Sequence, residues 1–155
     1  MNIRNYRSSD LESCAKLILD TSQKYNREDI IPWKEQDFFW FFDMENNREK
    51  IENFFTNSDV LIAENDNWEI IWLLRAEENR VKSFFVSNKY IHQWIGRTLF
   101  EEYKRGVVQK WYRFIWLFSS SYWVKFYESL WFKKNWDRFL RWECIRTYPM
   151  KLIIE

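Results

Sequence analysis

The segment from Val86 to Leu99 (VSNKYIHQWIGRTL) has the composition of an anion-binding loop. An apolar stretch ends at Val86 and residues with helical spacing follow, which is typical of a strand–loop–helix connection. The first-turn amides of such a helix have no partners within it and, with the helix dipole, favour a phosphate or pyrophosphate. Close approach of the main chain to a diphosphate needs a residue without a side chain, and Gly96 meets that need. Alone, this pattern is weak, because any such connection with one glycine looks alike.

The rest of the chain predicts the elements that must position this loop. Strands are expected, from apolar runs bounded by turn residues, at 3–7, 59–64, 69–75, 80–86, 112–118, 139–146 and 148–154. Helices are expected at 9–25, in one or two pieces over 34–57, at 95–110 and at 122–130. Ser9 and Glu12 form the capping box expected to begin the first helix, and the run at 112–118 is apolar enough to predict burial on both faces. The fold class is α/β (α+β): a mixed, mostly antiparallel central sheet of about seven strands with helices on both faces, in a single domain over residues 1–155.

The composition is that of an ordinary globular protein. Apolar residues make up 46% of the 155 positions, and 24 basic against 23 acidic side chains leave a net charge of +1. This balance gives no electrostatic support for a nucleic acid or an anionic membrane as a partner. Apolar runs such as FFWFF are too short for a bilayer, and the N-terminus MNIRNYRSSD lacks the apolar stretch of a signal peptide, which predicts a cytoplasmic protein. The single His92 and the distant Cys14 and Cys144 predict no metal site.

Two blocks of the sequence resemble motifs of the GCN5-related N-acetyltransferase (GNAT) superfamily. In the first, Val86, Gly96 and Leu99 stand where the family's acetyl-CoA motif has its valine, its last glycine and its helix leucine. Three positions depart from that motif. Asn88 stands in place of the usual proline, Ile91 in place of the usual arginine or glutamine, and Trp94 in place of the first glycine. The second block, FYESLWF at 126–132, is similar to the family's F-Y-x-x-L-G-F, with Trp131 in place of the glycine.

The resemblance implies an acetyl-CoA-dependent N-acetyltransferase in which an amine attacks the acetyl carbonyl directly, in a ternary complex. The catalytic residue would be Tyr127, which matches the family tyrosine that protonates the departing thiolate; a phenol pKa of about 10 suits this donor. A core aromatic of an amphipathic helix is the alternative role for Tyr127. The acceptor would be a small-molecule or protein amine, no metal is needed, and the protein would be a monomer or a homodimer.

The same resemblance assigns the cofactor-binding residues. Backbone groups of Phe85 and Val86 would hydrogen-bond the pantetheine amides, as a peptide adds a strand, and an amide near Val86 would stabilise the oxyanion. Ser120 stands where the family often has an asparagine facing the cofactor. The pyrophosphate would bind main-chain amides of one run of residues: His92, Gln93, Trp94, Ile95, Gly96 and Arg97.

Three further features of the sequence each have two possible interpretations. Glu77 and Glu78 could take the proton of the amine, or form a solvated surface pair. His92 titrates near neutral pH, although its motif position favours a backbone role over that of a base. The aromatic stretch Phe38–Phe42 could wall an apolar substrate pocket in the family's acceptor-facing region, or simply belong to the core.

Glycine is scarce and tryptophan abundant: the chain has two glycines, where average usage would give roughly 11, and 11 tryptophans. Five tryptophans stand where glycine is expected, in the two motifs, two hairpin turns and one helix end: Trp94, Trp131, Trp68, Trp136 and Trp111. An indole at positive φ costs on the order of 1 kcal/mol. We hypothesise that the source organism reads the codon UGA as glycine, so that most of these tryptophans are native glycines, whereas Trp116 and Trp142 are ordinary. The rival is an aromatic-loaded protein with a blocked cofactor loop.

Two other functions stay open on the sequence. A degenerate domain of the same fold could bind acetyl-CoA, or a protein partner, without turnover. Aromatics interleaved with arginines, as in WYRFIW and FLRWECIR, could stack the bases of a single-stranded nucleic acid, although the net charge of +1 argues against this.

Overall fold

The computed structural model describes residues 1–91 and 94–154, which form a mixed sheet of eight strands. The order across the sheet is β1-β2-β3-β4-β5-β8-β6, with β7 paired to β8, and β4 and β5 form the parallel pair. The strands are β1 (Asn2–Asn5), β2 (Asp59–Glu64), β3 (Ile70–Glu77), β4 (Arg80–Val86), β5 (Phe114–Ser119), β6 (Lys133–Lys134), β7 (Phe139–Arg141) and β8 (Ile145–Ile153). The helices are α1 (Leu11–Tyr25), α2 (Glu35–Trp40), α3 (Met44–Thr56), α4 (Ile95–Gln109) and α5 (Val124–Ser129).

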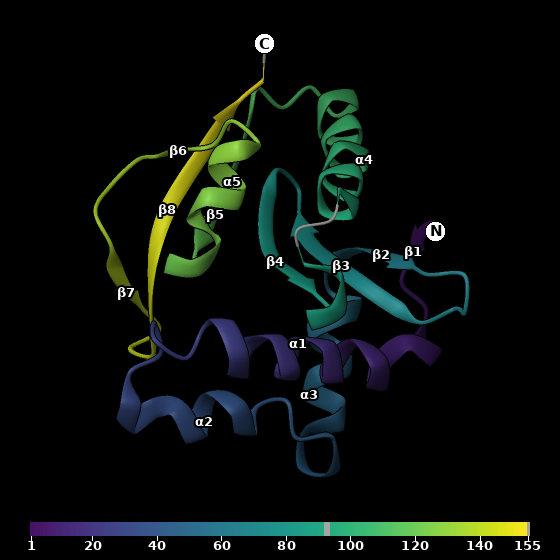
Figure 1. Cartoon of the computed structure of the whole chain (residues 1–155), viewed down its shortest axis with the longest axis vertical. Coiled ribbons are helices and arrows are strands. Elements are labelled where there is room, and N and C mark those ends of the chain that lie inside the picture. Colours follow the sequence, from purple (N-terminus) through teal and green to yellow (C-terminus); the bar gives the residue numbers. More distant parts are fainter. Residues whose placement is uncertain (92–93, 155) are drawn as a thin grey trace.

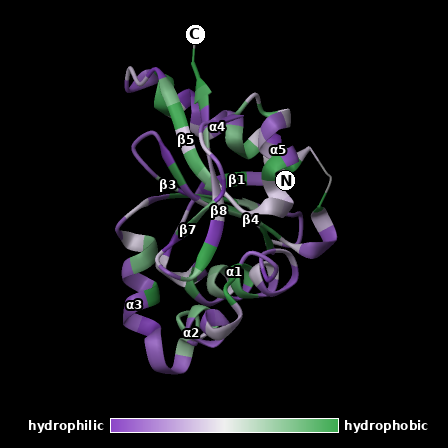
Figure 2. Ribbon diagram, turned by 90° about the vertical axis from the view of Figure 1, so that its left-hand side faces the viewer, coloured by the Kyte–Doolittle hydropathy of each residue, from purple (hydrophilic) through white to green (hydrophobic). Residues whose placement is uncertain are grey.

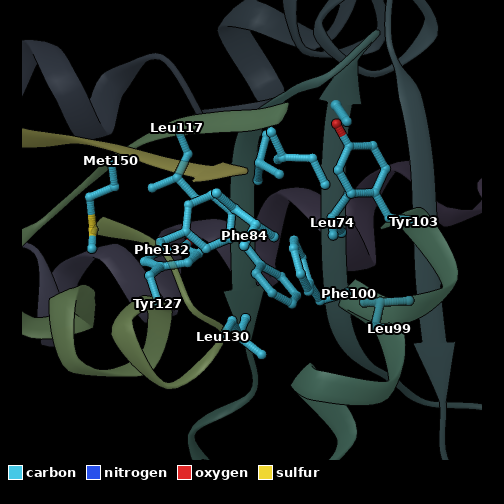
Figure 3. Packing of buried hydrophobic residues seen from close by; sticks show 14 of the residues in the cluster. Leu74, Phe84, Leu99, Phe100, Tyr103, Leu117, Tyr127, Leu130, Phe132 and Met150 are labelled. Atoms are coloured by element: carbon cyan, nitrogen blue, oxygen red, sulfur yellow. The ribbon is translucent and has the colours of Figure 1, made fainter. Parts of the chain in front are cut away.

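The helices lie in two layers on opposite faces of the sheet (Figures 1 and 2). Apolar residues of α1 and α3, such as Ile18 and Phe55, pack with Leu73 of β3 in one buried cluster. Residues of α4 and α5, such as Phe100 and Tyr127, pack with the next residue, Leu74, in the other (Figure 3). Successive side chains of a strand point to opposite faces, so β3 contributes to both cores. Among the described residues, no helix is both long and apolar enough to cross a bilayer.

The two central strands, β4 and β5, separate from one another along their length. They pair only near the start of β4, where Arg80 is opposite Trp116 and Val81 is opposite Leu117. Beyond Val81, β4 keeps its antiparallel partner β3 up to Val86, while β5 keeps β8. The sheet is therefore split at the C-terminal ends of its two parallel strands, the edge at which open α/β sheets place their ligands.

The expected fold class is confirmed, and most elements have nearly the expected bounds. The region 34–57 divides into α2 and α3 because Asp43 caps α3, accepting a hydrogen bond from the Glu45 amide at 3.0 Å. The expected strand 139–146 is wrong in its second half, since β7 ends at Arg141 and β8 begins at Ile145. The two-residue strand β6 is not predicted, because so short a segment has no periodicity of its own.

Two local predictions are wrong. The expected capping box does not form: Asp10, rather than Ser9, anchors the start of the first helical segment, accepting from the Arg7 amide at 2.7 Å. Glu12 instead forms an exposed ion pair with Arg48. Strand β5 also alternates in burial rather than being buried on both faces: its aromatic side chains, Phe114, Trp116 and Phe118, are half-buried, and the residues between them are buried.

Candidate active site

A cavity of about 540 Å³ lies where β4 and β5 separate. Its walls come from both faces of the sheet: Phe42 and Phe54 belong to the layer of α1 and α3, whereas Phe84 and Tyr127 belong to that of α4 and α5. The cavity therefore passes through the sheet between the two strands. A larger hollow of about 730 Å³, between the β1–β2 end of the sheet and the last turns of α4, is lined by none of the expected catalytic or cofactor-binding residues among those the structure describes.

The register of β3 and β4 decides which backbone groups of β4 face the split. The Ser87 amide donates to the Ile71 carbonyl at 2.8 Å, so these two residues form a hydrogen-bonded pair. In an antiparallel ladder every second pair is hydrogen-bonded, and the next such pair along β4 is therefore Phe85 with Leu73 of β3. The N–H and C=O groups of Phe84 and Val86 point the other way, toward the side that β5 has left. The backbone of Phe84, rather than that of Phe85, therefore faces the split, and Phe85 lines the cavity.

Val86 is fully buried and lies just beyond the cavity. Its carbonyl oxygen accepts a hydrogen bond from Thr21 Oγ1, on α1, at 2.8 Å. Of its two backbone groups, the N–H is the one without a hydrogen-bond partner among the described residues on the open side. The expected pair of pantetheine contacts is thus reduced at Val86 to a single donor.

Ser120, at the end of β5, lines the cavity and is 8% exposed. Its hydroxyl donates to Asn26 Oδ1 at 3.0 Å. The next residue, Ser121, donates from its amide and its hydroxyl to the buried carboxylate of Asp29, both at 2.7 Å, and Arg138 also donates to that carboxylate. The loop that follows α1 therefore holds the end of β5 in place.

Tyr127 of α5 packs in the buried hydrophobic cluster (Figure 3) and also lines the same cavity. It is 7% exposed and packs with the rings of Phe84, Phe126 and Phe132. Burial raises the pKa of its phenol above the usual value, because the charged form would lose its hydration. The phenol is therefore protonated at neutral pH and able to donate a proton within the cavity.

The expected anion site is the start of α4, whose first turn has no side-chain cap. Among the described residues, the amides of Ile95, Gly96 and Arg97 have no side-chain partner and can face an anion. The guanidinium of Arg97 donates to the Ser129 carbonyl at 2.7 Å, which joins this turn to the end of α5. Of the remaining expected residues, His92 and Gln93 lie outside the described residues.

Trp94 and Gly96 differ from the expectation. Trp94 is 77% exposed, has an ordinary φ of −65° and does not line the cavity, so its indole does not block the split between the strands. Gly96 does not have positive φ, and a Cβ at this position would lie 2.5 Å from the ring of Trp72 on β3. Its lack of a side chain is therefore required for the packing of α4 on the sheet.

The charged side chains that line the cavity are all basic among the described residues: Arg75, Lys82 and Arg141. Glu77 is exposed and pairs with Lys82 at 2.6 Å, and Glu78 lies in the hairpin between β3 and β4 and lines the other hollow. Neither glutamate reaches the cavity as a base. The aromatic stretch does contribute to its wall, through three residues of α2 and the turn after it: Phe38, Phe41 and Phe42.

Sequence reasoning does not identify Thr21, Asn26 or Asp29 as residues of the site. Thr21 interrupts the apolar spacing of α1, and the other two follow its C-terminus, where polar residues ordinarily face water. All three are buried here, because they bind groups of β4 and β5 that are more than 60 positions away in the sequence. Phe84 could have been identified from the sequence, because it lies two residues before Val86 and alternate residues of a strand direct their backbone N–H and C=O groups to the same side.

The comparisons with known proteins agree with this architecture. The model of the acetyltransferase (GNAT) domain family matches residues 21–154. A GCN5-related N-acetyltransferase from Rhodopseudomonas palustris is similar to the chain, with a TM-score of 0.83 and 12% identity over 99% of this chain and 95% of that chain. A search of curated proteins finds no significant match.

Two similar structures were solved with a ligand. PaiA N-acetyltransferase from Thermoplasma acidophilum, in complex with coenzyme A, has a TM-score of 0.71 and 18% identity over 99% of both chains. YncA from Salmonella typhimurium, with acetyl-CoA, has a TM-score of 0.69 and 13% identity over 100% of this chain and 94% of that chain. These identities show a shared fold. Because the family model covers most of the 155 residues, the chain belongs to the GNAT acetyltransferase family.

Proposed function

We propose that the protein is an N-acetyltransferase, acting as one domain, that moves an acetyl group from acetyl-CoA to a primary amine in a ternary complex. The observation that carries this proposal is the cavity that passes through the sheet where β4 and β5 separate. Two substrates could enter it from opposite faces and meet between the strands. The solved relatives with coenzyme A or acetyl-CoA support the choice of donor.

The residues present fit such a donor. The uncapped first turn of α4 offers the amides of Ile95, Gly96 and Arg97 to a pyrophosphate. On β4, the groups of Phe84 and the Val86 amide face the side that β5 has left, where an extended chain of amides could pair as an added strand. Donor binding therefore uses main-chain groups, which tolerate the side-chain departures from the family motif.

The thioester supplies the acetyl group, and the chain positions the reaction around it. The amine nitrogen forms a bond to the carbonyl carbon, and the carbon–sulfur bond breaks. The Val86 amide stabilises the oxyanion, and the buried phenol of Tyr127 gives its proton to the departing thiolate. The proton lost by the amine passes to water, because no acidic side chain lines the cavity among the described residues.

The test combines turnover with binding. Free coenzyme A is measured with acetyl-CoA and a panel of small primary amines, and the melting temperature is measured with acetyl-CoA alone. We expect stabilisation by acetyl-CoA and release of coenzyme A that depends on the amine. Stabilisation without turnover on any amine would instead identify a non-catalytic domain that binds acetyl-CoA, and the absence of both would contradict the proposal.

A further inference from the structure

The lining of the cavity carries positive charge, and no acidic side chain lines it among the described residues. Arg75 and Arg141 line it, and Arg80 lies beside them at the start of β4. Lys82 is the basic lining residue with an ion pair, to Glu77. Among the described residues, the partners of the Arg75 guanidinium are all neutral: it donates to the Phe54 carbonyl at 3.3 Å and to two serine hydroxyls.

Arg141 and Arg80 converge on one aromatic ring, that of Phe118 on β5. Their guanidinium carbons lie 3.9 Å and 5.4 Å from its centroid. In the described part of the chain, neither guanidinium has an ion pair or a side-chain hydrogen bond, and Arg80 Nε is buried without a partner. Burial, and after it the charge of Arg80, lowers the pKa of Arg141 to about 10. Two half-buried like charges this close are unfavourable until an anion joins them.

A polar group and an apolar wall complete the arrangement. Thr147 of β8 lines the cavity, is 4% exposed, and its hydroxyl has no hydrogen-bond partner in the described structure. The cavity is also lined by Phe38 and by three aromatic rings that pack against one another, those of Phe41, Phe42 and Phe54. The guanidinium carbon of Arg75 lies 3.5 Å from the centroid of the Phe54 ring. A volume of about 540 Å³ is that of a site for a small molecule.

We propose that the acceptor is a small apolar amine that also carries a carboxylate, and that Arg141 binds this carboxylate at the mouth of the cavity. This inference rests on the proposed function of the same cavity. The planar fork of a guanidinium matches a carboxylate, and stacking on Phe118 holds the fork in a fixed orientation. The aromatic wall holds the apolar body of the acceptor, which leaves the amine directed to the split between β4 and β5.

The test compares amines that differ only in the carboxylate. Two pairs cover two spacings: L-phenylalanine against phenethylamine, and 4-(aminomethyl)benzoate against benzylamine. We expect kcat/KM to be at least about tenfold higher for the carboxylate-bearing member of one pair or both, the size of a charge-assisted hydrogen bond. In Arg141→Met this preference should disappear, so that kcat/KM for the two members of each pair differs by less than about twofold.

Arg146→Met is the matched control, because Arg146 is an exposed arginine of β8 that does not line the cavity, and it should keep the preference. Turnover without a preference in either pair, or a preference that survives in Arg141→Met, would overturn the inference and leave the proposed function standing. Absence of turnover on every amine would overturn the proposed function instead. In that case melting temperatures decide the inference: the carboxylate-bearing amines must stabilise the wild type and not Arg141→Met.

Discussion

Four tryptophans adopt φ between 51° and 70°, a region in which an L-residue is strained. They are Trp68, Trp111, Trp131 and Trp142, each between 72% and 83% exposed. An indole exposed to water gains little burial to offset the cost of such a backbone. The first three were expected at positive φ, whereas Trp142 contradicts its interpretation as an ordinary strand residue, because it lies in the turn between β7 and β8. The hypothesis that glycine is native at these sites is supported by the backbone.

Replacing any of these four residues with glycine should therefore stabilise the protein. We expect each Trp→Gly variant to gain about 0.5–1 kcal/mol in free energy of unfolding, which is the relief of strain less the entropy that glycine adds to the unfolded chain. Denaturant unfolding measures this gain. Trp136→Gly is the control, because Trp136 is 78% exposed without positive φ, and should gain nothing. UGG codons at the four positions would contradict the recoding hypothesis even if the variants are stabilised.

A second prediction at the scale of single residues concerns the catalytic role of Tyr127. In Tyr127→Phe, kcat should fall about 100-fold with little change in KM, because the thiolate loses its proton donor. The melting temperature should hardly change, since the described residues give this phenol no hydrogen-bond partner. Tyr103→Phe is the control: its hydroxyl donates to the Glu78 carbonyl at 3.0 Å, so that variant should lose about 1 kcal/mol of stability and keep kcat. An unchanged kcat in Tyr127→Phe would leave Tyr127 with only a packing role.

At the scale of the elements, the two glycines of α4 have different structural roles, which alanine substitutions can distinguish. Gly96→Ala should cost about 1–3 kcal/mol, because its Cβ would overlap the ring of Trp72 and move the helix away from the sheet. Gly106→Ala, where a Cβ meets nothing within 4 Å, should instead gain about 0.5–1 kcal/mol from helix propensity. Equal effects in unfolding experiments would contradict the packing argument. Trp72→Phe should reduce the cost of Gly96→Ala.

An ion cluster links β1, β2 and α1. The Arg4 guanidinium donates to Asp10 at 2.8 Å and 2.9 Å and also to Glu64, and all three side chains are largely buried. Burial would raise the pKa of Asp10, but the bonds from Arg4 and the Arg7 amide outweigh it and hold that pKa below its usual range. The bonds from Arg4 likewise lower the pKa of Glu64.

Because both carboxylate pKa values are lower in the folded state, their stabilisation is present above the unfolded pKa values, about 4, and is lost as pH falls through the folded values. Arg4→Met should cost about 2–4 kcal/mol at pH 7 by leaving two facing carboxylates without their cation. Urea unfolding from pH 7 to pH 2 should show a smaller loss of stability on acidification in Arg4→Met than in the wild type. The control is Arg48→Met, which removes the exposed pair with Glu12 and should leave the pH dependence unchanged.

At the scale of the whole molecule, α1 and the loop after it bridge the two strands that separate. Thr21 binds the end of β4, and Asn26 and Asp29 bind the residues that follow β5. This bridge therefore joins the ends of the two strands between which the cavity lies. Its parts are far apart in the sequence, so the cavity exists only when the complete fold is formed.

Asp29→Ala tests the bridge. We expect a loss of about 1–3 kcal/mol, since Ser121 and Arg138 lose their shared acceptor. Hydrogen exchange at the amide of Ser121 should accelerate more than exchange in β2 or β3, and the KM of the acceptor should rise. The exposed Asp20→Ala, which removes only a surface pair with Lys16, should change none of these. Uniform acceleration across the sheet would indicate a general loss of stability rather than a bridge.

The sequence by itself determined the helices, most strands and the family, because these depend on local properties. Periodicity defined 59–64 and 80–86 as strands. Turn and helix-end chemistry placed strained residues at Trp68 and Trp111, and the family motif placed one at Trp131. The same turn argument is wrong at Trp136, which has no positive φ. The motif residues Val86, Gly96, Leu99 and Tyr127 indicated the acetyltransferase family through their spacing alone.

Only the tertiary structure decided the rest, because it depends on contacts between distant segments. The register of β3 against β4 turned the backbone of Phe84, rather than that of Phe85, to the split. The packing of Trp72 explained Gly96, and the separation of β4 from β5 brought Arg141 and Phe118 to one cavity. Such pairings follow from how the whole chain buries its apolar surface, and no local stretch of sequence contains that information.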